Sequence, residues 1–215
     1  MKEVSTSFLS NNDYTDLIKK LNNTSTDYIH FDVMDGKFVD NKNLSVSELC
    51  KLIDICKKKV DIHFMVNDPI KYIEKIALRK IDYITIHREL KNFDSIFNQA
   101  KMYGFKIGIA IKPETSIEKV IPYLKDCNLI LVMSVEPGKS GQEFIHSSMD
   151  KVNSLRKVIS DNNLNVKISI DGGINDSNLS YLENVDIVVS SSFILKDYSN
   201  IELIRMSGSS NEEKI

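Results

Sequence analysis

Short runs of apolar residues alternate along the chain with longer stretches in which apolar residues recur at helical spacing. The short runs predict eight strands, at residues 4–9, 29–34, 60–66, 82–87, 106–111, 129–135, 166–170 and 186–190. A helical segment is expected after each strand, including residues 116–122, 179–182 and a brief last helix from about Asn200. Alternating strands and helices are typical of a parallel sheet with helical crossovers.

The number of strand–helix units predicts how this sheet is organised. Eight units within 215 residues, with no linker between them, favour a single α/β domain built as a closed (β/α)8 TIM barrel over residues 1–206. The polar residues 207–215 then form a C-terminal tail that we expect to be disordered. An open doubly wound sheet is the competing architecture, and it is disfavoured because no G-x-G-x-x-G motif follows the first strand.

The second predicted strand combines an apolar face with a chemically reactive one. His30, Asp32 and Met34 fall between apolar neighbours, and side chains two residues apart share one face of a strand. A histidine and a carboxylate placed in this way can point at one metal ion or one substrate. Asp35-Gly36 marks the turn that ends the strand, so the reactive groups lie where a barrel carries its chemistry.

Three of the four histidines, His30, His63 and His87, lie within predicted strands near their carboxyl ends. Further polar residues at or just after that same end of the strands are Ser7, Asp32, Glu89, Glu136 and Asp171. A lone strand histidine is usually a hydrogen-bonded core residue, and we keep that interpretation for His87. For His30 and His63 we favour a functional role, because each has a methionine close behind it and acidic groups nearby.

Composition and charge narrow the possible partners. Hydrophobic residues make up 42% of the chain and charged residues 27%, which is ordinary for a soluble globular protein. A formal net charge of -2 gives no electrostatic reason to expect nucleic acid or a membrane surface as partner. No apolar run approaches ~20 residues, and the first residues lack an apolar signal-peptide core, so we expect a cytoplasmic protein. The three cysteines lack metal-site spacing and are expected to be reduced.

The segment from Tyr28 to Asn41 resembles the signature of ribulose-phosphate 3-epimerases, His-x-Asp-Val-Met-Asp-Gly-x-Phe-Val-Pro-Asn. Five further motifs continue the resemblance in the order and spacing of that family. They are Asp61-Ile-His-Phe-Met-Val66, Thr85-Ile-His-Arg-Glu89, Ile111-Lys-Pro-Glu-Thr115, Val132-Met-Ser-Val-Glu-Pro-Gly138 and Ile170-Asp-Gly-Gly-Ile174. The resemblance covers nearly the whole chain and implies a barrel of the ribulose-phosphate-binding type.

The resemblance implies a metal-dependent isomerase of carbohydrate metabolism. Family members hold one divalent metal ion through two histidines and two aspartates, which correspond to His30, Asp32, His63 and Asp171. Zinc, iron, manganese and cobalt all suit such a mixed ligand set. Asp32 and Asp171 are then the catalytic pair, because inversion at carbon 3 through a cis-enediolate needs an acid and a base on opposite faces. Relatives commonly form homo-oligomers, so we expect one here.

The resemblance also implies which residues contact a phosphosugar. These substrate-binding residues are Ser7, Met34, His63, Met65, Met133, Gly141, Gly172, Gly173, Ser191 and Ser192. The glycines and serines are expected at the phosphate, where backbone N–H groups of barrel loops bind anions. From the residues alone we would interpret the methionines as core filler, whereas for Gly172-Gly173 a simple tight turn is the less favoured interpretation.

Several residues depart from the family pattern near the expected phosphate site. Lys139 and Ser140 replace an aromatic residue and a glycine, and Asp40 replaces a proline. Ser191 stands where the family has glycine, which would cost about 1 kcal/mol if that position required a positive φ. Phe193 is bulkier than expected. None of these departures affects the four expected metal ligands.

Four functions remain open at this point. The leading hypothesis is epimerisation of D-ribulose 5-phosphate to D-xylulose 5-phosphate in the pentose phosphate pathway. A second hypothesis keeps the mechanism and changes the substrate to a six-carbon ketose phosphate such as D-allulose 6-phosphate. A third is a barrel that binds phosphosugars without turnover. A fourth is a metal-free decarboxylase, for which Lys112 is the only suitably placed lysine.

Overall fold

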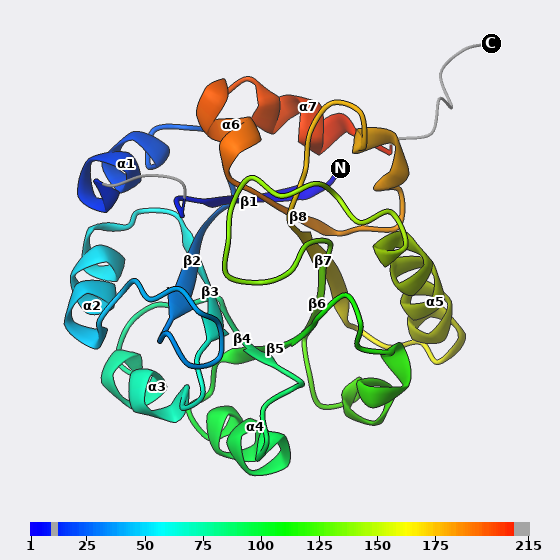
Figure 1. Cartoon of the computed structure of the whole chain (residues 1–215), viewed down its shortest axis with the longest axis horizontal. Coiled ribbons are helices and arrows are strands. Elements are labelled where there is room, and N and C mark those ends of the chain that lie inside the picture. The colour runs from blue at the N-terminus through cyan, green and yellow to red at the C-terminus, as the bar shows by residue number, and fades with distance from the viewer. Residues whose placement is uncertain (10–12, 209–215) are drawn as a thin grey trace.

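The computed structural model, which describes residues 1–9 and 13–208, confirms the closed barrel (Figure 1). Eight parallel strands pair in sequence order and β8 closes the ring against β1. The strands are β1 (Glu3–Ser7), β2 (Tyr28–Met34), β3 (Lys59–Met65), β4 (Tyr83–His87), β5 (Lys106–Ile111), β6 (Leu129–Met133), β7 (Lys167–Asp171) and β8 (Ile187–Ser190). Within the described residues the sheet closes on itself, so the competing doubly wound architecture is wrong.

Helices surround the barrel on its outer face (Figure 1). They are α1 (Tyr14–Leu21), α2 (Val46–Ile55), α3 (Ile70–Ile76), α4 (Phe93–Lys101), α5 (Ser148–Asp161), α6 (Ser192–Lys196) and α7 (Asn200–Met206). Local sequence sets their limits, as at α2, where the Ser45 hydroxyl accepts from the Glu48 N–H and the Glu48 carboxylate accepts from the Ser45 N–H. This reciprocal pair satisfies two N–H groups that the first turn would leave unbonded.

Two of the expected helices are only 3₁₀ turns. Residues 116–122 form two short turns, Ile117–Lys119 and Ile121–Tyr123, because Pro122 lacks the N–H that a continuing helix requires. The segment around Leu179 forms one turn, Leu179–Tyr181. Just before it, the Asn178 side chain donates to the Gly173 carbonyl and accepts from the Asn175 N–H, which fixes the path of residues 173–178.

Alternation along the strands separates an outer from an inner core. Ile29, Phe31 and Val33 of β2 pack into the apolar layer beneath the helices. The opposite face of the strands fills the barrel with a second cluster, made of Tyr28, Tyr83, Ala110, Leu129, Leu131, Met133, Val135, Ile187 and Val189. His30 and Asp32 share this inner side, as the period of two predicts. The barrel therefore presents polar groups at its mouth above a packed interior.

Strand register brings the candidate residues to one level. Asp32 of β2 is paired with His63 of β3, and Met133 of β6 with Asp171 of β7. Of the predicted tail, Ser207 and Gly208 form a turn that follows α7, and residues 209–215 lie outside the described residues. Within residues 1–9 and 13–208, no helix is long and apolar enough to span a membrane.

Candidate metal and active site

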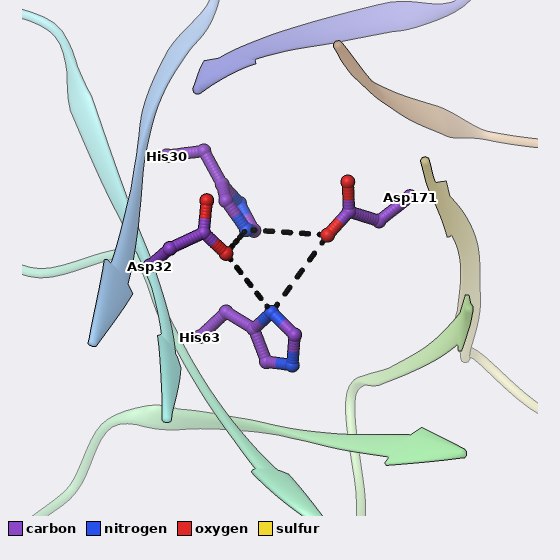
Figure 2. A group of neighbouring side chains, drawn as sticks. All are labelled: His30, Asp32, His63 and Asp171. Atoms are coloured by element: carbon purple, nitrogen blue, oxygen red, sulfur yellow. Dashed lines mark hydrogen bonds and ion pairs between the residues drawn. The ribbon is translucent and has the colours of Figure 1, made fainter. Parts of the chain in front are cut away.

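Four side chains converge inside the mouth of the barrel (Figure 2). His30 and Asp32 come from β2, His63 comes from β3, and Asp171 reaches in from β7 on the opposite wall. Asp32 Oδ1 lies 3.4 Å from His30 Nε2 and 3.2 Å from His63 Nδ1. Asp171 Oδ2 lies 3.9 Å from His30 Nε2 and 3.7 Å from His63 Nδ1. The structure thus brings together all four residues expected to hold a metal.

The donor set fits a single divalent metal ion. One ligand atom from each residue lies within 4.8 Å of all the others. Metal–ligand bonds of about 2.0–2.2 Å place neighbouring donors roughly 3 to 4 Å apart, which matches the distances between these atoms. His30 Nε2 is buried and has no hydrogen-bond partner among the described residues. A buried ring nitrogen without a partner is costly, and a metal ion among these donors would satisfy it.

His30 is oriented from behind by a third carboxylate. His30 Nδ1 lies 2.7 Å from Asp61 Oδ2, and the Ser5 hydroxyl donates to the same oxygen at 3.0 Å. A carboxylate behind a histidine holds a proton on the nitrogen that faces it, so the opposite nitrogen is free to bind metal. Sequence analysis assigned no role to Asp61. Its position, two residues before His63 in an alternating strand, is the signal that could have revealed it.

His63 is backed by a second histidine. His63 Nε2 lies 2.9 Å from His87 Nε2, and His87 Nδ1 lies 2.9 Å from Glu89 Oε2. Burial lowers the pKa of His87 to about 4, although its hydrogen bond with Glu89 opposes the shift. As expected, His87 is a hydrogen-bonded residue of the wall and lies outside the four-residue metal group.

The two aspartates of the group have different electrostatic environments. Burial, together with the nearby Asp32 carboxylate, raises the pKa of Asp171 to about 6. Burial also opposes ionisation of Asp32, but the adjacent His30 and His63 rings outweigh it and hold the pKa of Asp32 well below its usual range. The Ser7 hydroxyl donates to Asp32 Oδ2 at 2.8 Å, which fixes the plane of that carboxylate. Asp32 is thus the more firmly held carboxylate of the pair.

Both aspartates line a solvent-open cavity at the barrel mouth. Most of the predicted substrate-binding residues line the same cavity, namely Ser7, Met65, Met133, Gly141, Gly172, Gly173, Ser191 and Ser192. Met34 and His63 do not line it. Met34 is buried, and its backbone N–H donates to the Asn43 side chain at 2.8 Å. A contact between Met34 and substrate therefore stays a prediction.

The backbone conformation and the close packing of the loop both require glycine at positions 172 and 173. Their φ angles are 116° and 66°, in the left-handed region that favours glycine. A Cβ at Gly172 would lie 2.3 Å from the Val135 side chain, and one at Gly173 would lie 2.6 Å from the Phe144 backbone. The loop after β7 thus passes close to the loop after β6.

The departures from the family pattern fall around the same cavity. Lys139 and Ser140 line it. Ser191 has a φ of -112°, so a serine there carries none of the strain that a positive φ would impose. Phe193 lies mostly buried at the start of α6 and lines an adjoining hollow. Lys139, Ser140 and Ser191 thus belong to the wall of the cavity, and none of the departures is a member of the metal group.

Comparisons with a family model and with curated proteins identify the same group of relatives. The model of the ribulose-phosphate 3 epimerase family matches residues 3–195. Ribulose-phosphate 3-epimerase from Methanocaldococcus jannaschii is 34% identical over 180 residues, which span 82% of this chain and 76% of the relative. The enzyme of that name from Helicobacter pylori strain 26695 is 33% identical over 188 residues, spanning 86% and 87%.

A solved structure supports the same architecture at greater distance. Phosphoribosyl anthranilate isomerase from Thermococcus kodakaraensis superposes with a TM-score of 0.62 at 14% identity, covering 98% of this chain and 100% of that one. At this identity the likeness concerns the fold alone.

Proposed function

The chain belongs to the ribulose-phosphate 3-epimerase family, an isomerase class, and on that premise we propose that it converts D-ribulose 5-phosphate to D-xylulose 5-phosphate in a metal-dependent reaction. The observation that carries the proposal is that two carboxylates from opposite walls, Asp32 and Asp171, line one solvent-open cavity and also lie close to two buried imidazole nitrogens.

We assign the proton transfers to Asp32 and Asp171. Inversion at carbon 3 removes a proton from one face of the carbon and returns one to the other face. β2 and β7 lie across the barrel from each other, so a substrate in the cavity would have one carboxylate on each side (Figure 2). One aspartate accepts the proton from carbon 3, which converts the substrate to a cis-enediolate. The other aspartate donates a proton to carbon 3 on the opposite face. The direction of reaction decides which aspartate acts first.

The other residues of the site hold and orient these groups. His30, Asp32, His63 and Asp171 would bind a divalent ion, zinc, iron, manganese or cobalt, that supplies electrophilic stabilisation of negative charge on the substrate oxygens. The Ser7 hydroxyl keeps one Asp32 oxygen engaged, so the other oxygen faces the two histidines. Met65 and Met133 line the cavity beside the aspartates and exclude water from the reacting carbon.

We place the phosphate at the loops after β6, β7 and β8. Gly141, Gly172, Gly173, Ser191 and Ser192 line that end of the cavity. Glycines allow the backbone to approach a phosphate closely, and backbone N–H groups then donate to its oxygens. Because Lys139 and Ser140 alter the wall at this end, a six-carbon ketose phosphate is a second candidate substrate.

Isotope exchange tests the proposal. The purified protein is analysed for bound metal and is then incubated with D-ribulose 5-phosphate or D-allulose 6-phosphate in deuterated water. Deuterium at carbon 3 together with the epimeric product is the expected result, and the substrate that exchanges faster identifies the sugar. Bound metal without exchange into either sugar would contradict catalysis and favour a binding barrel. A cytoplasmic location and a homo-oligomeric state stay predictions, and light scattering tests the second.

A further inference from the structure

Two residues behind His63 form a hydrogen-bonded chain that the reaction itself does not use. We propose that Glu89 and His87 are positioning residues that hold the proton of His63 on Nε2 and so leave Nδ1 free to bind the metal. This inference rests on the metal site of the proposed function.

The contacts run in a continuous line from the barrel wall to the metal group. Glu89 Oε2 lies 2.9 Å from His87 Nδ1, and His87 Nε2 lies 2.9 Å from His63 Nε2. At the far side of its ring, His63 Nδ1 faces Asp32 Oδ1 at 3.2 Å and Asp171 Oδ2 at 3.7 Å. The side chains of His63 and His87 are both fully buried, so water cannot replace any of these partners.

The positions of the protons follow from this geometry. A carboxylate only accepts hydrogen bonds, so the His87 nitrogen that faces Glu89 carries a proton. Two ring nitrogens 2.9 Å apart share a single proton, because two N–H groups would repel each other. Placing that proton on His87 would make it a buried cation behind a bound metal ion. With a metal ion bound, the proton therefore sits on His63 Nε2, and His63 Nδ1 directs its lone pair to the metal in place of a hydrogen bond to Asp32 Oδ1.

Hydrogen bonds fix the orientation of the Glu89 carboxylate, so that Oε2 faces His87 and Oε1 faces the loop after β5. Its Oε1 accepts from the Lys112 backbone N–H at 2.9 Å and from the Thr115 hydroxyl. The loop that presents these donors is itself fixed by Lys151, whose Nζ donates to the carbonyls of Lys112, Pro113 and Thr115. A backbone N–H can only donate, so the position of Oε1 must always be an acceptor.

This constraint makes Glu89→Gln a directional test. The glutamine oxygen must take the Oε1 position to accept from the Lys112 N–H, which turns the amide NH₂ toward His87 Nδ1. His87 then accepts at Nδ1 and carries its proton on Nε2. His63 must in turn accept at Nε2 and carry its proton on Nδ1, the atom that would bind metal. The substitution keeps the size of the side chain and reverses every proton in the chain.

Cobalt(II) titration of the chelator-treated full-length protein measures the effect on metal binding. We expect E89Q to bind cobalt about 10–100-fold more weakly than the wild type, the range typical for partners behind metal ligands. Glu114→Gln is the matched control, because it removes the same charge from an exposed position in the loop after β5, the loop that Glu89 contacts. E114Q should bind cobalt as the wild type does. Equal affinity of E89Q and the wild type would overturn the inference.

Nitrogen-15 NMR of the histidine rings reads the protons directly and needs no metal. In the metal-free wild type, His87 should be protonated at Nδ1, and in metal-free E89Q at Nε2. If Glu89 merely stabilised the loop, His87 would be protonated at the same nitrogen in E89Q as in the wild type. That result would overturn the inference. Wild-type protein that binds no cobalt would instead overturn the proposed metal site, so the two failures are distinguishable.

His87→Gln provides a second test through coupling. A glutamine at position 87 can still accept from the His63 N–H but no longer transmits the orientation of Glu89. E89Q should therefore weaken cobalt binding less than about 3-fold in the H87Q background, compared with 10–100-fold alone. Additive losses in the double variant would show that Glu89 acts by another route and would overturn the relay.

Discussion

The two walls that face each other across the metal group differ in how firmly they hold their side chains. The ligand wall, formed by β2, β3 and β4, carries His30, Asp32 and His63, each backed by at least one further hydrogen bond. The open wall, formed by β7 and the loop after it, carries Asp171, which is 16% exposed, and the two left-handed glycines. Under the proposed function, this difference assigns the positioning of the metal mainly to the ligand wall and contact with the substrate mainly to the open wall.

The largest expected effect is the loss of activity when either of the two catalytic carboxylates is replaced. Asp32→Asn and Asp171→Asn should each lower the rate of epimerisation about 10²–10⁴-fold, because each removes one of the two proton-transfer groups. At saturating metal, each variant keeps the carboxylate on one face of carbon 3. Each should then exchange deuterium into only one epimer, and the two variants should exchange opposite epimers.

Mass spectrometry of both sugar phosphates after incubation in deuterated water checks this prediction. The exposed Asp161→Asn serves as the control and should behave as the wild type. If both variants exchanged the same epimer, the assignment of one aspartate to each face would be wrong.

The open wall should be the more sensitive to backbone change. Gly172→Ala should lower the free energy of unfolding by about 2–4 kcal/mol, from the cost of a left-handed alanine and the clash with Val135. Gly104 has a similar φ of 78°, but a Cβ there meets nothing within 4 Å, so Gly104→Ala should cost only about 1–2 kcal/mol. Urea denaturation compares the two, and equal losses would contradict the close packing of this loop.

The ligand wall should be sensitive to the residues behind its histidines. Asp61→Asn should weaken cobalt binding about 10–100-fold, because the amide can present its NH₂ to His30 Nδ1 and displace the proton held there. Titration as described for E89Q measures the loss. Unchanged cobalt affinity in the variant would mean that His30 is oriented by packing alone.

The smallest expected effect is a dependence of stability on acid. Burial would raise the pKa of Glu89, but hydrogen bonds from His87, Lys112 and Thr115 outweigh it and lower the pKa to about 2, from an ordinary value of 4.5. A lowered folded-state pKa contributes stability above about pH 4.5, and this contribution is lost as the pH falls toward 2.

The free energy of unfolding of wild type and E89Q, both metal-free, should therefore differ more at about pH 7 than at about pH 3. Urea denaturation at both values measures the difference. A gap that stays constant would mean that Glu89 is not ionised in the way its contacts indicate.

Much of this architecture could be predicted from the sequence, because period-two alternation in β2 and helical spacing between strands are local signals. The metal group followed from His30-x-Asp32 and from motif resemblance. Alternation could have placed Asp61 on the inner face of its strand, but the partners of Asp61 and Glu89 could not be predicted, since they depend on which residues of neighbouring strands and loops meet. The helix expected at 179–182 is only a 3₁₀ turn, a difference that the spacing of apolar residues does not reveal.

The parallel register has a consequence for how this protein becomes functional. Three members of the metal group come from adjacent strands, but Asp171 joins them only after the chain has wrapped around most of the ring. An incomplete ring, such as a nascent chain still lacking β7, would offer three donors and no second acid. Tight metal binding would then require the complete barrel. Because the ion would bind the closed barrel more tightly than an incomplete one, it would stabilise the closed form against opening.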